Sequence, residues 1–253
     1  MPRGVTVVKV GGNEVEDAAW LRELARLLAD CFPLVVVHGG GREVSALQRS
    51  FGAEPEWRDG LRVSSADTVR LASMVLSGVV NKRLVGALLS TGVDAAGLSG
   101  EDGALVMATP AQGGALGRTG VVASVRAPLL AALLGLGLVP VLSPISRGID
   151  GEPLNVNADD VAAAVAAALG AARLLFVSNV DGVMLGTVTA ADIGRDDIES
   201  AIAAGAVSGG MAPKLRAAAR AAEAGVGDVR IGGLALLSGD AGTRVHARVE
   251  VLA

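Results

Sequence analysis

Residues 5–12 have the sequence VTVVKVGG, an apolar run rich in β-branched residues that carries one lysine and ends on a glycine pair. A strand that lacks polar alternation is typical of a parallel sheet covered on both faces. Four further runs share this character. They are Leu34–Val37, Leu138–Leu142, Leu174–Val177 and Val229–Ile231. The stretch at 5–12 therefore predicts the first strand of a mainly parallel central sheet.

Helical patterns rich in alanine and leucine alternate with these strands, which predicts helices on both sides of the sheet. The expected helices are Asp17–Ala29, Arg42–Ser50, Ala66–Ser90, Asp159–Leu169 and Met211–Ala224. Trp57–Val63, Ala104–Ala108 and Gly120–Val125 resemble hairpin strands, and Ser146–Leu154 a loop or hairpin. We found no linker or internal repeat. The predicted fold is thus a single α/β domain over 1–253, a three-layer αβα sandwich whose sheet has an antiparallel patch.

Composition excludes several classes of protein. The chain has 253 residues, 51% of them hydrophobic, which argues against disorder. A net charge of −4 and a pI near 5.3 argue against nucleic-acid or acidic-membrane binding. One cysteine, Cys31, permits no intramolecular disulfide, and two histidines permit no three-histidine zinc site. We therefore expect small-molecule substrates, no nucleic acid and no protein-bound metal.

The long uncharged stretch between Arg126 and Arg147 raises the question of a membrane span. Pro128, Pro140 and Pro144 interrupt it, so we expect a short helix, a turn and a buried strand there. The first residues contain no signal-peptide pattern. We expect a cytoplasmic protein that does not enter a membrane.

Glycine clusters follow two of the expected strands. Gly11-Gly12 come after the first strand, and Gly39-Gly40-Gly41 come after the second. Adjacent glycines let backbone N–H groups approach an anion, and a following helix points its positive end at the same place. The pattern of neither cluster matches a P-loop or a dinucleotide fingerprint. Each cluster alone is equally well explained as a tight turn, but the two together favour a polyphosphate, or a phosphoryl group moving between two sites.

Two of the three lysines occupy unfavourable positions. Lys9 lies in an apolar strand, where a charge is costly without an anionic partner. Lys214 lies in the first turn of a helix, where a cation opposes the helix dipole. A bound phosphate would remove both objections; the alternative is that each is an ordinary surface lysine. For Lys82, within a helix, we expect that ordinary role.

The segment Asn155–Asp160 opens another helix. Asn157 is a plausible N-cap, with Asp159 in the first turn, where an acid could orient both lysines. The Arg62 guanidinium suits a carboxylate substrate, although for this arginine taken alone the sequence favours a solvated surface position. We expect His38 and Cys31 to be structural.

Taken in order, VVKVGG (7–12), HGGG (38–41), GLRV (60–63), Asn81-Lys82, GLSGEDG (97–103), NVNAD (155–159), SNVDGV (178–183) and GGMAPK (209–214) resemble the amino acid kinase superfamily. The resemblance covers essentially the whole chain. GLRV with NVNAD resembles the acetylglutamate branch. It implies ATP-dependent phosphorylation of the γ-carboxylate of N-acetyl-L-glutamate in arginine biosynthesis, with Mg²⁺ bound to the nucleotide, and a homodimer.

The resemblance also implies roles for individual residues. Lys9, Asp159 and Lys214 correspond to catalytic residues. The substrate positions it implies are Gly40, Gly41, Arg62, Asn155 and Asn157. The ATP positions it implies are Gly11, Gly12, Ser178, Asn179, Asp181, Gly182, Gly209 and Met211. By the same resemblance, a first lobe over about 1–155 binds the acyl amino acid and a second over about 156–253 binds ATP.

Two other functions remain open from the sequence. Asn179, where aspartate is frequent, also occurs in related kinases that act on aminoadipate held by a carrier protein, and such an enzyme would need basic residues such as Arg58, Arg62 and Arg70 around its pocket. A non-catalytic regulator would be expected to lack one of the three catalytic positions, all of which are present. By the same resemblance, arginine-inhibited members are hexamers joined by an extra N-terminal helix. We expect no such helix in this chain, and therefore no inhibition by arginine.

Overall fold

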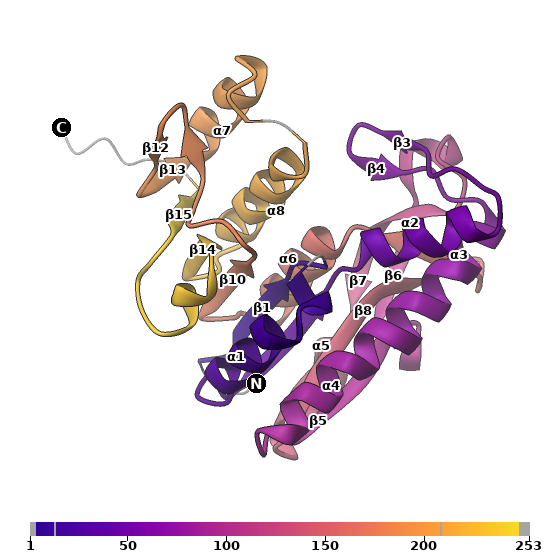
Figure 1. The fold of residues 1–253 in the computed structure, drawn as a ribbon, viewed down its shortest axis with the longest axis horizontal. Coiled ribbons are helices and arrows are strands. Elements are labelled where there is room, and N and C mark those ends of the chain that lie inside the picture. The colour runs from indigo at the N-terminus through magenta and orange to yellow at the C-terminus, as the bar shows by residue number, and fades with distance from the viewer. Residues whose placement is uncertain (1–3, 13, 208, 248–253) are drawn as a thin grey trace.

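The computed structural model describes residues 4–12, 14–207 and 209–247, and its centre is one long, mainly parallel sheet (Figure 1). Eleven strands form it among these residues, in the order β13-β15-β14-β10-β1-β2-β8-β6-β7-β9, with β5 paired to β8. The strands are β1 (Thr6–Val10), β2 (Leu34–His38), β5 (Ala95–Gly100), β6 (Val106–Pro110), β7 (Thr119–Val125), β8 (Val139–Gly148), β9 (Pro153–Val156), β10 (Arg173–Val177), β13 (Asp192–Gly194), β14 (Asp228–Gly232) and β15 (Thr243–His246). The five predicted parallel strands are thus confirmed.

Antiparallel pairing occurs in two regions of this sheet. β6 pairs with β7, and β8 turns back on β9, which confirms the predicted patch and the hairpin at Ser146–Leu154. β14 also pairs antiparallel with β15, which the sequence did not predict. The hairpin of β3 (Trp57–Arg58) and β4 (Leu61–Arg62) forms a small sheet of its own, as does that of β11 (Met184–Leu185) and β12 (Val188–Thr189).

Helices cover both faces of the sheet, so the predicted three layers are confirmed. The helices are α1 (Ala18–Leu28), α2 (Gly41–Ser50), α3 (Ala66–Ser73), α4 (Asn81–Ser90), α5 (Ala127–Gly135), α6 (Ala158–Leu169), α7 (Arg195–Ala203) and α8 (Met211–Glu223). A π-helical turn, Met74–Val80, joins α3 to α4, and short 3₁₀ turns lie at Glu14–Glu16, Asp102–Ala104, Ala111–Gly114 and Leu234–Leu237. The described part of 126–147 is α5 followed by buried β8, as predicted.

Alternation along β1 divides the core in two. Val8 and Val10 pack with α1 and the α3–α4 helix, whereas Val7 packs with residues of α5, α6 and α8. Because side chains alternate between faces, Lys9 shares the face of Val7 and therefore points toward α6 and α8. The central strand therefore places the charged end of Lys9 beside the two helices that carry its partners.

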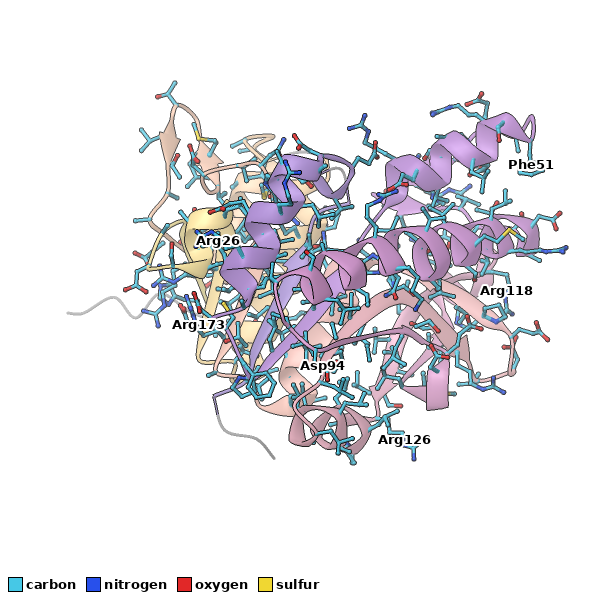
Figure 2. All side chains as sticks on the ribbon, turned by 60° about the horizontal axis from the view of Figure 1, so that its bottom comes forward. Arg26, Phe51, Asp94, Arg118, Arg126 and Arg173 are labelled. Atoms are coloured by element: carbon cyan, nitrogen blue, oxygen red, sulfur yellow. The ribbon has the colours of Figure 1, made fainter. Side chains whose placement is uncertain are left out.

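The segment Ala66–Ser90 is, within the described ranges, the one helix long and apolar enough to cross a membrane. Its most apolar window has a mean hydropathy of 1.3 and is 39% buried. Leu76 and Leu84 on its inner side belong to the core, while Met74, Val79 and Leu89 on its outer side are each 52% exposed. Figure 2 shows other side chains at the periphery, including Phe51 at the end of α2, Arg118 and Arg126. The helix therefore packs one side into the core and leaves apolar residues exposed on its outer face.

Candidate active site

The structure brings Lys9, Asp159 and Lys214 together in one buried cluster. The Nζ atom of Lys9 lies 2.8 Å from Oδ1 of Asp159, and Nζ of Lys214 lies 3.1 Å from the same oxygen. The three residues are 7–8% exposed. β1 supplies the first lysine, the first turn of α6 the aspartate, and the first turn of α8 the second lysine. The predicted meeting of the three residues is confirmed, while their catalytic roles stay a prediction.

Local capping explains how the aspartate reaches this place. The Asn157 side chain accepts a hydrogen bond of 2.8 Å from the Asp159 N–H, so it caps α6 as expected. Asp160, the next residue, points away and pairs with Arg220 on α8. Consecutive acids on one helix turn are thereby separated, and only Asp159 faces the lysines.

The electrostatics of the cluster favour an additional anion. Burial by itself would raise the pKa of Asp159, but the positive charges of Lys9 and Lys214 outweigh it and lower that pKa. Burial, aided by the charge of Lys9, lowers the pKa of Lys214 to about 8 despite the nearby Asp159. Two cations share one carboxylate, which leaves a buried net positive charge. A buried charge is costly unless it is paired, so the cluster suits a negatively charged ligand.

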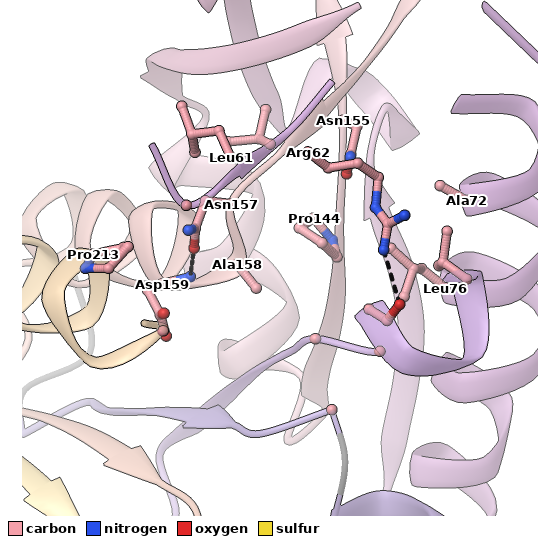
Figure 3. Close-up of a pocket in the computed structure, with 18 of the residues that line it drawn as sticks. Leu61, Arg62, Ala72, Leu76, Pro144, Asn155, Asn157, Ala158, Asp159 and Pro213 are labelled. Atoms are coloured by element: carbon pink, nitrogen blue, oxygen red, sulfur yellow. Dashed lines mark hydrogen bonds between the residues drawn. The ribbon is translucent and has the colours of Figure 1, made fainter. Parts of the chain in front are cut away.

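A pocket of about 260 Å³ begins at this cluster (Figure 3). Asp159, which Lys9 contacts, lies on one side of it, and Arg62 lies further along. Its lining residues are Lys9, Gly12, Gly39, Gly40, Gly41, Val44, Trp57, Gly60, Leu61, Arg62, Ala72, Leu76, Thr119, Pro144, Asn155, Val156, Asn157, Ala158, Asp159, Gly210 and Pro213. All five predicted substrate-binding residues are among them, although nothing bound shows their role.

Arg62 is buried, which excludes the surface role that the sequence left open. It is 5% exposed, and its guanidinium donates to Gln48 Oε1 (3.0 Å), Ser45 Oγ (2.7 Å) and the Gly41 carbonyl (2.9 Å). The Trp57 ring stacks at 4.4 Å from the guanidinium carbon. Every one of these contacts is neutral, and among the described residues no carboxylate forms an ion pair with Arg62. The charge therefore suits a carboxylate supplied by a ligand.

The two glycine turns touch each other. A Cβ atom on Gly12 would lie 2.1 Å from the Gly40 nitrogen, so only glycine permits this approach. Gly40 precedes α2 without any side-chain cap, which leaves N–H groups of the first turn for a ligand. The two turns that we expected to bind anions thus form one continuous surface at the carboxyl ends of β1 and β2.

The remaining predicted nucleotide residues lie outside this pocket. Gly11 and Ser178 sit at adjacent strand ends, because the Gly11 N–H bonds to Val177 and the Ser178 N–H to Gly232 (both 2.9 Å). Gly182 packs against Thr243, where a Cβ would lie 2.7 Å from the Thr243 hydroxyl. Asn179 and Asp181 follow β10, and Gly209 and Met211 lie at the start of α8. None of them lines the 260 Å³ pocket, so their binding of ATP stays a prediction.

Sequence reasoning missed several residues that hold the site. Ser45 and Gln48, with Gly41, form the face of α2 that binds Arg62. Ser64 accepts hydrogen bonds from Asn155 Nδ2 (3.1 Å) and from the Thr119 hydroxyl (3.2 Å), and is fully buried. One signal was available: Ser45 and Gln48 are polar residues at core-facing positions of an amphipathic helix.

Comparison with known proteins identifies the family. The model of the amino acid kinase family matches residues 4–233. The chain therefore belongs to the amino acid kinase family, as its motifs predicted.

Relatives within the family are more specific. The chain is similar to the acetylglutamate kinase of Roseiflexus sp. (strain RS-1), with 47% identity over 90% of this chain and 88% of that one. It is also similar to the acetylglutamate kinase of Methanopyrus kandleri, with 42% identity over 95% and 99% of the two chains.

Solved structures share the fold. The Streptococcus mutans UA159 protein smu.665 has a TM-score of 0.87 and 30% identity over 97% of this chain and all of that one. Carbamate kinase from Giardia lamblia has a TM-score of 0.71 at 16% identity over 96% and 98% of the two chains, which supports the fold alone.

Proposed function

We propose that this protein catalyses ATP-dependent phosphorylation of the γ-carboxylate of N-acetyl-L-glutamate, giving N-acetyl-L-glutamyl 5-phosphate in arginine biosynthesis. The observation that carries the proposal is the pair of cationic ends in one pocket. Arg62, without an acidic partner among the described residues, suits one carboxylate, and Lys9 beside Lys214 suits a second carboxylate with the phosphoryl group. An acyl amino diacid has its two carboxylates at opposite ends. The acetylglutamate kinases that are 42–47% identical support this choice.

The proposed mechanism needs no general base. A carboxylate is ionised at neutral pH and is already a nucleophile, so its oxygen attacks the γ-phosphorus, the bond to the β,γ-bridging oxygen breaks and ADP leaves. Lys9 and Lys214 stabilise the negative charge on the transferring group, and Asp159 holds both at fixed positions. The turn of Gly11 and Gly12 lies at the phosphates: the Gly12 N–H acts on them, while the Gly11 N–H is bonded to the Val177 carbonyl. Contact between Gly12 and Gly40 keeps donor and acceptor adjacent.

We assign the two substrates to different parts of the chain. Gly40, Gly41, Arg62 and Asn155 bind the acyl amino acid, with Asn157 just beyond them, so the lobe over about 1–155 is the acceptor side. The lobe over about 156–253 binds ATP through Ser178, Asn179, Asp181, Gly182, Gly209 and Met211. Lys214 lies in α8, which packs against β10, and this supports the assignment.

We propose that Mg²⁺ enters with ATP, coordinated by the phosphates. In the described part of the chain, no group of three or more His, Cys, Asp or Glu side chains is arranged to hold a metal. When bound, the ion neutralises phosphate charge.

We further propose a cytoplasmic homodimer that binds neither nucleic acid nor membrane. The acidic pI near 5.3 supports the absence of nucleic-acid and anionic-membrane partners. The apolar outer face of the Ala66–Ser90 helix, with Met74, Val79 and Leu89, supports the dimer.

The carrier-bound aminoadipate alternative has less support. Its basic docking surface would need accessible arginines, but Arg62 is buried, and Arg58 pairs with Glu56 at 3.3 Å. Of the three arginines expected for such a surface, Arg70 alone is exposed without an ion pair in the described structure. A non-catalytic regulator is disfavoured because all three members of the charged cluster are present and in contact.

The decisive experiment measures ADP release by the purified protein with ATP and Mg²⁺. N-acetyl-L-glutamate is compared with N-acetyl-L-aspartate, L-glutamate and L-2-aminoadipate. We expect turnover with N-acetyl-L-glutamate and at least tenfold lower kcat/KM with the others. Faster turnover of aminoadipate, or no ADP above the acceptor-free rate with N-acetyl-L-glutamate, would contradict the proposal.

A further inference from the structure

A buried polar network lies behind the acyl-side glycine turn, and the proposed mechanism does not use it. His38 ends β2 directly before Gly39, Gly40 and Gly41. Its Nε2 lies 3.2 Å from Nδ2 of Asn81, the first residue of α4, and its Nδ1 lies 2.8 Å from the Gly39 carbonyl oxygen. Both side chains are fully buried.

The direction of each hydrogen bond follows from the chemistry of the partners. The Asn81 amide nitrogen can only donate, and it also donates to the Val141 carbonyl at 2.9 Å, with the Leu98 carbonyl more distant at 3.4 Å. His38 Nε2 must therefore accept, which leaves the ring proton on Nδ1, where it donates to the Gly39 carbonyl. The network thus selects one tautomer of a neutral imidazole. Burial, more than the nearby Lys9 and Lys82 charges, lowers the pKa of His38 to about 4, while Glu43 acts in the opposite direction.

The Asn81 amide is itself held in one orientation. Its Oδ1 accepts from Lys82 Nζ at 3.0 Å, and Lys82 Nζ also donates to the Gly97 carbonyl at 3.1 Å. A Cβ on Gly97 would lie 1.9 Å from Asn81 Oδ1, so β5 passes directly against the amide. If the Asn81 amide were rotated by 180°, its nitrogen would no longer donate to the Val141 carbonyl. These contacts give Asn81-Lys82 a structural purpose that the sequence alone did not reveal.

The Ala66–Ser90 helix, which contains Asn81, also touches the glycine turn at Gly40. A Cβ on Gly40 would lie 2.5 Å from Leu76 Cδ2 and 3.2 Å from Val80 Cγ2. The turn is therefore held from one side by apolar packing and from the other by the hydrogen bond from His38 to Gly39. With both in place, the Gly39–Gly40 and Gly40–Gly41 peptides are fixed where they line the pocket.

We propose that His38 and Asn81 are positioning residues for the acyl amino acid: Asn81 fixes the His38 tautomer, and His38 fixes the Gly39 carbonyl and with it the Gly40 and Gly41 N–H groups. This inference rests on the proposed function. It assigns a role in acceptor binding, so its loss raises the KM for N-acetyl-L-glutamate more than the KM for ATP.

Two substitutions of the same residue separate the two hydrogen bonds. In His38→Asn, the shorter amide can donate to the Gly39 carbonyl in place of Nδ1 but cannot reach Asn81. In His38→Gln, the longer amide oxygen can accept from Asn81 but leaves the Gly39 carbonyl without its donor. Each variant loses one buried hydrogen bond, so a purely structural role predicts similar effects in both.

Steady-state kinetics with both substrates varied provides the test. The loss of one hydrogen bond changes a binding constant by roughly three- to tenfold. We therefore expect His38→Gln to raise the KM for N-acetyl-L-glutamate by about that factor. The KM for ATP should stay within twofold of the wild-type value. His38→Asn should restore most of the affinity for the acceptor. Equal acceptor KM values in the two variants, or an unchanged KM in His38→Gln, would overturn the inference.

Lys82→Met gives an independent test, because Lys82 is exposed and its loss spares the core. Without the ammonium, the Asn81 amide is less firmly oriented, and we expect a two- to threefold rise in acceptor KM that Lys82→Arg reverses. If both His38 variants fail to fold, an unchanged KM in Lys82→Met overturns the proposal. Turnover of N-acetyl-L-glutamate by the wild type distinguishes this failure from failure of the proposed function.

Discussion

At the scale of single residues, the site depends on one carboxylate oxygen that holds two ammonium groups. Asp159 Oδ1 contacts both Lys9 and Lys214, so neither lysine can turn away without leaving a buried charge less well compensated. Phe176 limits the space further, since its ring centroid lies 5.4 Å from Lys214 Nζ. The two cations are thereby held in advance at the place where charge would develop.

Removing either cation should therefore affect the chemical step. We expect Lys9→Met and Lys214→Met each to lower kcat by about 10²- to 10³-fold, the usual effect of losing one preorganised donor. Arg216→Ala, two residues along α8 and paired with Glu199 on the surface, is the matched control and should keep wild-type kcat. Retention of more than a tenth of the activity in either lysine variant would argue against their proposed role.

The lowered pKa of Lys214, about 8, predicts a pH dependence. A lysine carries its charge below its pKa, so kcat/KM for ATP should be constant near pH 7 and fall about tenfold per pH unit above pH 8. Lys214→Arg keeps a charge throughout this range, and any activity it retains should lack the alkaline decline. A wild-type profile that stays flat to pH 10 would contradict the assignment.

Contact between the two glycine turns predicts an unusually severe alanine effect. In Gly12→Ala the new methyl group would lie 2.1 Å from the Gly40 nitrogen, so the phosphate and acyl turns must separate. We expect kcat/KM to fall by at least about 10²-fold, because the reacting groups lose their alignment. Gly135→Ala on α5, where nothing lies within 4 Å of the added methyl, is the control for the substitution itself.

At the scale of elements, the Ala66–Ser90 helix begins at a defined cap. The exposed Ser65 hydroxyl accepts from the Thr68 N–H at 3.1 Å. Ser65→Ala should lower the free energy of unfolding by about 1 kcal/mol, measured by urea denaturation followed by circular dichroism. Ser65→Asp keeps an acceptor at the cap and should retain most of the stability; equal losses in both variants would show that the cap contributes little.

The sequence predicted those elements whose physical signal is local. Buried parallel strands are continuous runs of apolar, β-branched residues, and all five were located correctly. Ala95–Gly100 was missed because its sequence, AAGLSG, contains no β-branched residue, yet β5 forms through pairing with β8. α7 was missed because its nine residues, RDDIESAIA, are mostly polar and bury only Ile198.

The sequence predicted those residues of the candidate site whose charge is unfavourable at their position in a strand or helix. Lys9 in an apolar strand and Lys214 at a helix start were both unfavourable locally, and a shared carboxylate explains both. The environment of Arg62 was not predictable, because Ser45 and Gln48 reach it only after α2 packs against β4. Contact between Gly12 and Gly40 likewise depends on the pairing of β1 with β2.

At the scale of the whole molecule, ligand binding should stabilise the fold. MgATP binds the folded protein, so at about 100 times its Kd it should add roughly 2.7 kcal/mol and raise the Tm by about 5 to 10 °C. Differential scanning fluorimetry with and without Mg²⁺ measures the shift, and GTP under the same conditions tests the choice of nucleotide. No shift with MgATP would contradict the proposed nucleotide site.

The proposed dimer is tested through the outer face of the same long helix. Val79 is 52% exposed, and Val79→Asp should reduce the mass in solution from twice 25.1 kDa to that of a monomer. Ile149→Asp, at a residue 68% exposed on the turn between β8 and β9, is the control. Light scattering after gel filtration measures the mass, and a monomeric wild type would contradict the dimer.

The position of β1 in the middle of the sheet also has a consequence for biosynthesis. Among the described strands β1 leaves the ribosome first, and its two neighbours are β2, made shortly afterwards, and β10, which begins only at Arg173. At ordinary translation rates β10 is synthesised roughly 10 to 30 s after β1. Until then an apolar strand carries one unpaired edge, the kind of surface that recruits chaperones or aggregates. The lysine at the centre of the site therefore belongs to a strand whose sheet pairing is completed late.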